Sequence, residues 1–246
     1  MEVLEALHTR RSIRKYLDVP VEWDKVGTIL DAGRVAPSAG NLQSWRFVVV
    51  RNPEKKKQIA DACLQQYWME QAPVFIVIFA EMNKLENHYG IRGVRLYSIQ
   101  SCSMAALQMM LAAHSLGLGT CYVSAFDENA MARIFNLPDS VRPQCIITIG
   151  YPDETPEAPL RFRLENIAWH EVWNPSNPPV AGTGGSGRVV DPDYTVWNFR
   201  VAEKPVQFAK EAAKDIERVT RKRRQRLFSK LKEHGKKFAK KKEEEK

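Results

Sequence analysis

The alternation of helical and strand patterns along the chain predicts an α/β or α+β protein with one layered core. The strongest strand signal is 74–80, a run of seven apolar residues that is typical of a central strand covered on both faces. The strongest helix signal is 94–116, which is apolar over much more than one stripe. Such a helix is buried either inside a large core or against another subunit.

Two helices are expected before the first strand. Residues 2–9 place apolar side chains at helical spacing, and a second helix runs from about 21 to 30 with an apolar face. Gly33 weakens this second helix, and Pro37 blocks its continuation because proline lacks the backbone N–H that a helix interior needs.

Strands and helices then alternate up to residue 150. The β-branched segment 46–51 predicts a strand, and Pro53 starts a helix through about residue 65, because proline suits the first helical turn. Gly117 and Gly119 end the long helix, since a helix C-terminus favours residues that adopt positive φ. The remaining expected elements are strands over 120–123 and 144–150 and a helix over about 128–135.

The net charge of +8 is confined to the C-terminal part of the chain. Residues 1–200 hold 20 basic and 21 acidic side chains, a net charge of −1, whereas residues 201–246 hold 17 basic and 8 acidic ones, a net charge of +9. The hydrophobic content of 44% is enough for a sizeable core and excludes global disorder.

The cysteines and the N-terminus predict a cytoplasmic protein. The four cysteines, at 63, 102, 121 and 145, form no CxxC pair and are too sparse for a disulfide-stapled domain, so we expect them reduced and buried. The N-terminus has no apolar signal-peptide core, and the longest apolar run is too short to cross a bilayer. The five histidines show no metal-ligand spacing, so no metal site is expected.

The C-terminal region predicts a linker followed by a basic helix. Residues 174–192 contain four prolines and four glycines, which favours an extended connection. In 205–220 a narrow apolar seam at helical spacing favours docking on this chain or a partner subunit. The strongly basic residues 221–246 are open to two interpretations, a solubilising tail or a segment that binds nucleic acid or an acidic membrane surface.

A first cluster of candidate binding residues lies in 9–16. It holds Arg10, Arg11 and Arg14 together with Ser12 and Lys15. Guanidinium groups and a hydroxyl at this density suit a phosphate, which they bind through charge-assisted hydrogen bonds. The alternative is a solvated basic turn.

A second cluster lies in 36–47, where small residues allow a ligand to approach the backbone closely. Ser38, Asn41 and Gln43 offer a hydroxyl and two amides to a planar heterocycle. The alternative is an ordinary connection from a helix to a strand.

Together the two clusters resemble the FMN-dependent nitroreductase family. The sequence R-R-S-I-R at 10–14 is followed by A-P-S-A-G-N-L-Q-S-W-R-F at 36–47. The resemblance continues through A-A-H-S-L-G-L-G-T-C at 112–121, I-G-Y-P at 149–152 and R-F-R-L-E at 161–165. It covers about residues 3–173, and five motifs in the right order make it specific.

The resemblance implies an α+β layered fold in which helices flank a central mixed sheet. It implies a homodimer with FMN at the subunit interface and NAD(P)H as electron donor. The expected organisation is an FMN-binding domain over 1–173, a linker over 174–202, and a basic helical C-terminal extension over 203–246.

The family pattern also implies which residues contact FMN. Arg10, Arg11 and Ser12 would hold the phosphate and ribityl end, and Arg14 would lie near the pyrimidine edge. Because R-F-R at 161–163 lacks the family's proline, the choice of phosphate ligand between its two arginines stays open. The remaining implied contacts are Arg161, Arg163 and the backbone of Val123, Ser124 and Ala125 near flavin N5, and, from the other subunit, Pro37, Ser38, Ala39 and Asn41, with Gln43 as a further polar candidate in that loop.

The implied reaction passes two electrons from NAD(P)H through flavin N5 to a nitroaromatic, a quinone or a similar electron-poor acceptor, by a ping-pong mechanism. Reduced flavin collects negative charge at N1 and C2=O, so a cation at Arg14 would stabilise it, and no further catalytic residue is expected. Reductive dehalogenation and flavin-consuming oxidation are alternatives within the same family. A binding protein that acts through its basic tail is the alternative from another class.

Overall fold

The structure of the protein is a computed structural model that describes residues 1–162, 167–169 and 173. The chain divides into two compact units. Of the described residues, 1–156 belong to the first unit and those from 157 onward to the second, and each unit is considered by itself. The predicted linker over 174–202 and the predicted basic extension over 203–246 lie outside the described residues.

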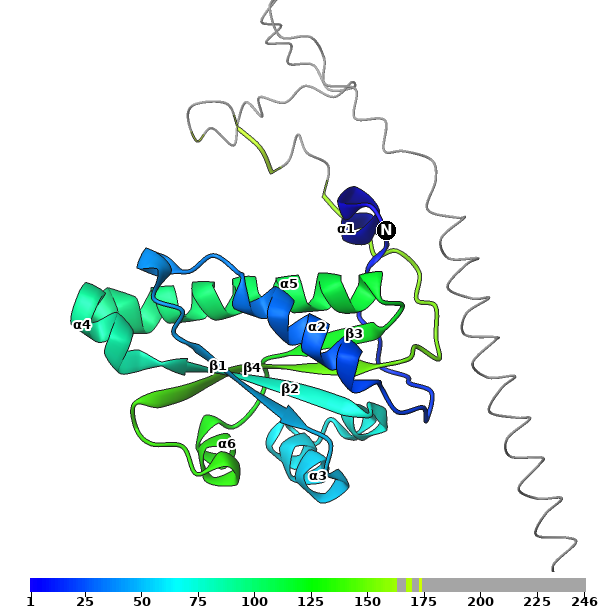
Figure 1. Cartoon of the computed structure of the whole chain (residues 1–246), viewed down its shortest axis with the longest axis horizontal. Coiled ribbons are helices and arrows are strands. Elements are labelled where there is room, and N and C mark those ends of the chain that lie inside the picture. Colours follow the sequence, from blue (N-terminus) through cyan, green and yellow to red (C-terminus); the bar gives the residue numbers. More distant parts are fainter. Residues whose placement is uncertain (163–166, 170–172, 174–246) are drawn as a thin grey trace, which may run out of the picture. The chain divides into compact units, whose positions relative to one another are not determined.

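The first unit is built on a four-stranded sheet (Figure 1). Its order is β1-β2-β4-β3, and all three pairs of neighbouring strands are antiparallel. The expectation of a mixed sheet is therefore not met within the described residues, where parallel pairing is limited to an isolated bridge between Ser12 and Thr120. The strands are β1 (Trp45–Val50), β2 (Val74–Glu81), β3 (Gly119–Val123) and β4 (Val141–Gly150).

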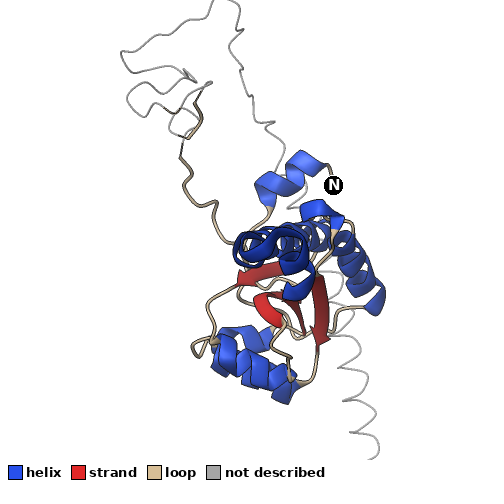
Figure 2. Cartoon of the chain, turned by 90° about the vertical axis from the view of Figure 1, so that its left-hand side faces the viewer, coloured by secondary structure: helices blue, strands red, loops and turns tan. Residues whose placement is uncertain are grey.

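Helices cover both faces of this sheet and give the α+β class expected from the sequence (Figure 2). Helices α2 and α5 lie on one face, and α3 and α6 lie on the other (Figure 1). The α-helices of the described residues are α1 (Val3–Thr9), α2 (Trp23–Arg34), α3 (Pro53–Ala62), α4 (Met82–Arg92), α5 (Ser98–Ser115) and α6 (Glu128–Phe135).

Strand β2 lies between these two helical layers. Ile76 and Ile78 belong to the core beneath α2 and α5, whereas Phe75, Val77 and Phe79 belong to the core above α3 and α6. All five side chains are at most 1% exposed. The prediction that this apolar run forms a central strand covered on both faces is confirmed.

The predicted long helix over 94–116 is shorter than expected and follows a helix that the sequence did not indicate. Helix α5 begins at Ser98, after a π-helical segment at Gly93–Tyr97, and α4 precedes that segment. Gly90 has φ +54° and ψ −147°, which interrupts α4. A Cβ on Gly93 would lie 2.4 Å from the carbonyl oxygen of Leu85, so only glycine allows this close approach.

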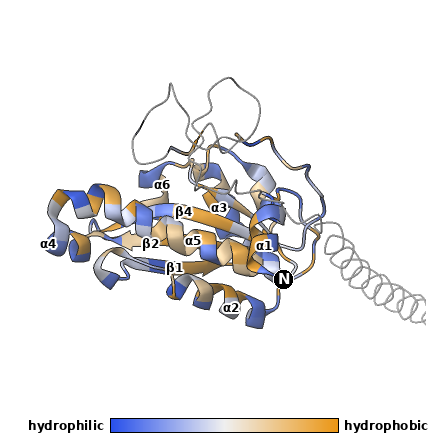
Figure 3. Ribbon diagram, turned by 90° about the horizontal axis from the view of Figure 1, so that it is seen from above, coloured by the Kyte–Doolittle hydropathy of each residue, from blue (hydrophilic) through white to orange (hydrophobic). Residues whose placement is uncertain are grey.

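Helix α5 has two apolar faces with different surroundings. Its inner face, which includes Cys102, Ala105 and Met109, is fully buried in the core. On its outer face Ile99 is 45% exposed and Leu107 is 46% exposed. Figure 3 views the molecule from the side of this helix, where apolar residues colour much of α5 and parts of α1. The outer face is thus apolar without being covered by the described part of the chain.

Candidate functional site

The arginine cluster is held against the edge strand β3. Ser12 forms the parallel bridge with Thr120, and the backbone N–H of Ile13 donates to the carbonyl oxygen of Thr120 at 2.9 Å. A Cβ on Gly119 would lie 2.8 Å from the Ile13 side chain, so this glycine allows the segment to pack closely on the strand. Backbone pairing therefore fixes where the cluster lies.

The start of the arginine cluster contacts His114, which lies near the C-terminal end of α5. The sequence motifs did not predict this contact. The Thr9 hydroxyl donates to the carbonyl oxygen of Glu5 at 2.7 Å, and its oxygen lies 2.8 Å from Nε2 of His114. Because the hydroxyl proton is used by Glu5, the imidazole donates to Thr9. Burial, followed by the positive charges of Arg10 and Arg11, lowers the pKa of His114. The two arginines therefore lie near this imidazole.

Three predicted site residues gather around the thiol of Cys121. Burial raises the pKa of this thiol, and Arg14, the Ser12 hydroxyl and Arg10 oppose that rise. The Arg14 guanidinium also lies 5.7 Å from the centre of the half-exposed Trp68 ring, in cation–π geometry. The structure thus brings together two cations and a hydroxyl at one edge of the sheet.

The segment that follows β4 closes the other end of the cluster. Oε1 of Glu154 accepts from the backbone N–H of Arg14 at 2.5 Å and from that of Lys15 at 3.1 Å. The backbone N–H of Asp153 donates to the carbonyl oxygen of Lys15 at 3.0 Å. Sequence reasoning missed Glu154 and Trp68, and the only available signal for Glu154 was its position two residues after the I-G-Y-P motif.

The second predicted cluster forms a turn with an unusual backbone. Gly40, Asn41 and Gln43 have φ of 56°, 55° and 48°, in the left-handed region. The Ser38 hydroxyl accepts from the backbone N–H of Gln43 at 3.1 Å, and the Gln43 amide donates to the carbonyl oxygen of Asn41 at 3.2 Å. Tyr89 of α4 packs on Gly40, where a Cβ would lie 2.3 Å from its hydroxyl oxygen. Left-handed backbone, internal hydrogen bonds and the contact with Tyr89 together fix the conformation of this turn, which distinguishes it from an ordinary helix-to-strand connection.

The two clusters lie toward opposite ends of α5 (Figure 1). The backbone N–H of Ala39 donates to the hydroxyl of Ser101 near the start of the helix, whereas Thr9 is bound to His114 near its end. These anchor residues are 13 positions apart, which corresponds to about 20 Å along a helix. One chain therefore does not bring the arginine cluster and the 38–43 turn into contact.

The remaining predicted contacts lie at the end of β3 and in the second unit. Val123 ends the pairing of β3 with β4 and is buried, whereas Ser124 and Ala125 are exposed. Val123 lies three residues after Thr120 along β3, which corresponds to about 10 Å. Arg161 lies in the second unit with an exposed side chain that donates to the carbonyl oxygen of Leu160 at 3.3 Å. Arg163 lies outside the described residues.

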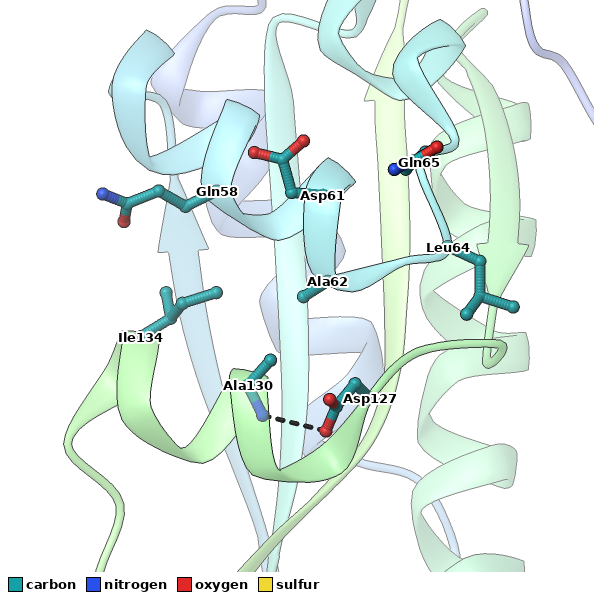
Figure 4. A pocket seen from close by; sticks show the side chains of 8 residues that line it. All are labelled: Gln58, Asp61, Ala62, Leu64, Gln65, Asp127, Ala130 and Ile134. Carbon is teal, nitrogen blue, oxygen red and sulfur yellow. Dashed lines mark hydrogen bonds between the residues drawn. The ribbon is translucent and has the colours of Figure 1, made fainter.

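An open groove of about 620 Å³ lies between α3 and α6, on the other face of the sheet (Figure 4). Its lining combines apolar and amide side chains with two carboxylates, Asp61 and Asp127. The Asp127 carboxylate caps α6 by accepting from the backbone N–H of Ala130 at 3.0 Å. None of the eight residues that line the groove is cationic, so it lacks candidate phosphate ligands such as the arginines at β3.

All four cysteines are free and buried, which confirms the prediction made from their spacing. Burial raises the pKa of Cys63, Cys102 and Cys145 to about 12, so these thiols stay protonated at neutral pH. Within the described residues, no three His, Cys, Asp or Glu side chains come together as metal ligands. In that same part of the chain, no helix has the length and apolar character needed to cross a membrane.

Comparison with known proteins places the chain in a family. The model of the nitroreductase family matches residues 7–151. A Methanothermobacter thermautotrophicus protein with the provisional name NADH dehydrogenase/NAD(P)H nitroreductase is 38% identical over 174 residues, which span 67% of this chain and 87% of that protein. The FMN reductase [NAD(P)H] of Bacillus subtilis is 31% identical over 70% of this chain and 74% of its own.

Solved structures agree with this assignment. A nitroreductase family protein from Clostridium difficile 630 has a TM-score of 0.63 at 29% identity and matches 70% of this chain and all of its own. YcnD from Bacillus subtilis, described as a hypothetical oxidoreductase, has a TM-score of 0.65 at 29% identity, over 71% of this chain and 76% of its own. The matched sequence spans the arginine cluster, the 38–43 turn and all four strands, and the chain belongs to the nitroreductase family.

Proposed function

We propose that this chain is an FMN-dependent oxidoreductase that passes two electrons from NAD(P)H to an electron-poor acceptor, such as a nitroaromatic or a quinone, in two alternating half-reactions. The family and the names of its relatives, among them FMN reductase and NADPH-flavin oxidoreductase, support this enzyme class. The observation that carries the proposal is the convergence of Arg10, Ser12 and Arg14 at the edge of β3.

The residues at this edge fit FMN chemically. Arg10, Arg11 and Ser12 supply the charge-assisted and neutral hydrogen-bond donors that a phosphate and a ribityl chain require. Bound FMN supplies the two-electron chemistry. Arg14 offers a fixed cation where negative charge collects on a reduced flavin, and a cation held in place stabilises that charge without reorganisation. The chain therefore contributes binding, orientation and electrostatics.

We further propose that the active form is a homodimer in which each FMN site takes residues from both chains. The outer face of α5 supports this proposal, because Ile99, Met104 and Leu107 together expose a strip of apolar surface. Helix α1, which packs on α5, adds the exposed Val3 and Leu4. A second chain would cover these faces and could bring its 38–43 turn to the arginine cluster of the first.

The C-terminal extension and the cellular location are separate proposals. The charge of +9 over 201–246 supports an electrostatic partner, nucleic acid or an acidic membrane surface, and the seam in 205–220 supports docking on the dimer. Truncation after Trp173 tests both, because an electrostatic arm would leave FMN binding and dimerisation intact, whereas loss of the dimer would establish docking.

The buried, unpaired cysteines support a cytoplasmic location.

Visible absorption of the purified protein tests the central proposal. We expect a yellow protein, or a colourless one that takes up one FMN per chain on titration, and oxidation of NAD(P)H when a quinone or nitroaromatic is added. Parallel double-reciprocal plots would support the ping-pong order. A protein that takes up no FMN would exclude the enzyme. Assays with aromatic halides, and mass spectrometry of reduced flavin exposed to oxygen, separate dehalogenation and flavin-consuming oxidation from simple reduction.

A further inference from the structure

We propose that Glu154 is a positioning residue that, together with Trp68, fixes the Arg14 guanidinium at the flavin site. This inference rests on the proposed function, because it assumes that Arg14 tunes a bound flavin. It concerns two side chains that none of the five sequence motifs contains, one from the segment after β4 and one from the short 3₁₀ helix Tyr67–Gln71.

Glu154 acts on the backbone of Arg14. A single carboxylate oxygen accepts from two successive backbone N–H groups, those of Arg14 and Lys15, at 2.5 and 3.1 Å. Hydrogen bonds from backbone N–H groups to a charged acceptor are among the stronger hydrogen bonds in proteins. Because both donors belong to the short segment between Ser12 and Tyr16 that carries the Arg14 side chain, Glu154 restricts the direction in which that side chain leaves the backbone.

Trp68 acts on the other end of the same side chain. Its ring lies beneath the guanidinium at 5.7 Å, within the range of a cation–π contact. The next residue, Met69, is fully buried in the core above α3 and α6, which anchors the short turn that presents Trp68. Arg14 is thus held at its backbone by a carboxylate and at its head group by an aromatic ring.

The charge of Glu154 has a second, separable effect. At the thiol of Cys121, Glu154 and Arg14 act with opposite sign, so the carboxylate lies close enough to offset part of the Arg14 field. A variant that removes the charge but keeps the acceptor therefore differs from one that removes both. Glutamine and alanine at position 154 provide this pair.

The segment stays folded without Glu154, because other bonds join it to β4. The Tyr16 hydroxyl lies 2.7 Å from the hydroxyl of Thr148, and the backbone N–H of Leu17 donates to the carbonyl oxygen of Tyr151 at 2.9 Å. Tyr16 also forms an isolated antiparallel bridge with Pro152. Loss of the Glu154 contacts should therefore loosen the segment around Arg14 and leave the fold intact.

The decisive experiment measures the reduction potential of bound FMN in Glu154→Gln and Glu154→Ala, in full-length protein with native Arg14 and in an Arg14→Ala background. Both variants lack the charge, so their difference reports position alone. With Arg14 present we expect alanine to lower the affinity for reduced relative to oxidised FMN about tenfold compared with glutamine, which corresponds to about 30 mV for a two-electron couple. In the Arg14→Ala background the difference should vanish.

Three further variants serve as controls. Asp153→Asn removes a neighbouring charge whose side chain has no role in the proposal, so it measures the effect of charge alone. Trp68→Leu against Trp68→Phe tests the aromatic contact without touching Glu154, and leucine should lower the potential relative to phenylalanine. Thermal unfolding of each apoprotein checks the fold.

Results that would overturn the positioning role of Glu154 differ from results that would overturn the proposed function. Equal potentials for glutamine and alanine at position 154, or a difference that persists without Arg14, would overturn the positioning role and leave the flavoenzyme intact. An unchanged potential in Arg14→Ala would overturn both the tuning role of Arg14 and this inference. Failure of the wild-type protein to bind FMN would overturn the proposed function itself.

Discussion

Two different kinds of candidate binding surface lie at the two ends of α5. At its C-terminal end the surface consists of charged side chains, Arg10 and Arg11 beside His114, attached to an edge strand by backbone pairing. Near its N-terminal end the surface consists of a turn whose conformation is left-handed at Gly40, Asn41 and Gln43.

The arginine cluster and the 38–43 turn therefore contribute different properties to a binding site. Fixed cations supply affinity for an anion, and that affinity depends on salt. A turn bonded to itself and packed on α4 supplies a preformed shape, and its cost appears in the stability of the fold. Substitutions at one end should therefore change ligand affinity, and substitutions at the other should change the free energy of unfolding.

The largest effect is expected on FMN affinity, when the arginines at the C-terminal end of α5 are removed. Arg10→Ala combined with Arg11→Ala removes the two proposed charge-assisted partners of the FMN phosphate, each worth about 1.5–3 kcal/mol. We expect FMN affinity to fall at least 100-fold at moderate salt, as measured by fluorescence titration. Riboflavin, which lacks the phosphate, should bind both proteins alike.

The matched control for this double variant is Arg34→Ala. Arg34 is an exposed arginine at the end of α2, and it is paired with Asp31 on its own helix. Its loss should leave FMN affinity unchanged. An equal loss of riboflavin binding in the double variant would show that the arginines maintain the fold and do not hold a phosphate.

A smaller effect, on the free energy of unfolding, is expected when the 38–43 turn is changed. Gly40→Ala places a Cβ at φ +56° and 2.3 Å from the Tyr89 hydroxyl oxygen, so it meets both backbone strain and a clash. We expect the free energy of unfolding to fall by at least about 1–2 kcal/mol in urea titrations, because left-handed backbone alone costs this much in a residue with a side chain. Adding Tyr89→Phe should recover only the part due to the clash.

The matched position is Gly27 on α2, where a Cβ would meet nothing within 4 Å. Gly27→Ala should stabilise the helix by about 0.5–1 kcal/mol, because alanine has the higher helix propensity. If both alanine variants shifted stability in the same direction, the turn at Gly40 would not be strained by a side chain.

The sequence predicted the elements that depend on local patterns and missed what depends on tertiary contacts. Strand β2 followed from its uninterrupted apolar run, and α6 was placed at its observed bounds. Helix α4 was missed because it is mostly polar and is interrupted by Gly90. The mixed sheet was implied by the family resemblance and is not observed among the described strands. The local sequence pattern could not correct it, because strand direction depends on long-range pairing.

The same distinction holds for the candidate site. Arg10, Ser12 and Arg14 were predicted because they stand close together in the sequence and in a family motif. Glu154 and His114 contact this cluster from positions 140 and 105 residues away along the chain. Motif spacing contains no information about contacts of that range, so residues of this kind emerge only once the fold is known.

The smallest effect is expected in the pH dependence of stability, to which His114 contributes at the cationic end of α5. The pKa of His114 is lowered by burial and by Arg10 and Arg11, against the opposing charge of Glu5 from α1. In the unfolded chain the imidazole returns to its ordinary pKa of about 6.5, so the unfolded state binds more protons whenever the pH lies between the folded pKa and that value. The apoprotein should therefore lose stability as the pH falls below about 6.5.

Urea unfolding between pH 5 and 8 measures this dependence. His114→Gln keeps a donor for Thr9 but cannot titrate, so its stability should fall less steeply toward acid than that of the wild type. His88→Gln, on the exposed surface of α4, is the control and should follow the wild type. Saturating FMN should flatten the wild-type profile, because a bound phosphate would offset the two arginines that disfavour the imidazolium. Identical slopes in wild type and His114→Gln would mean that the cationic end of α5 does not act on this histidine.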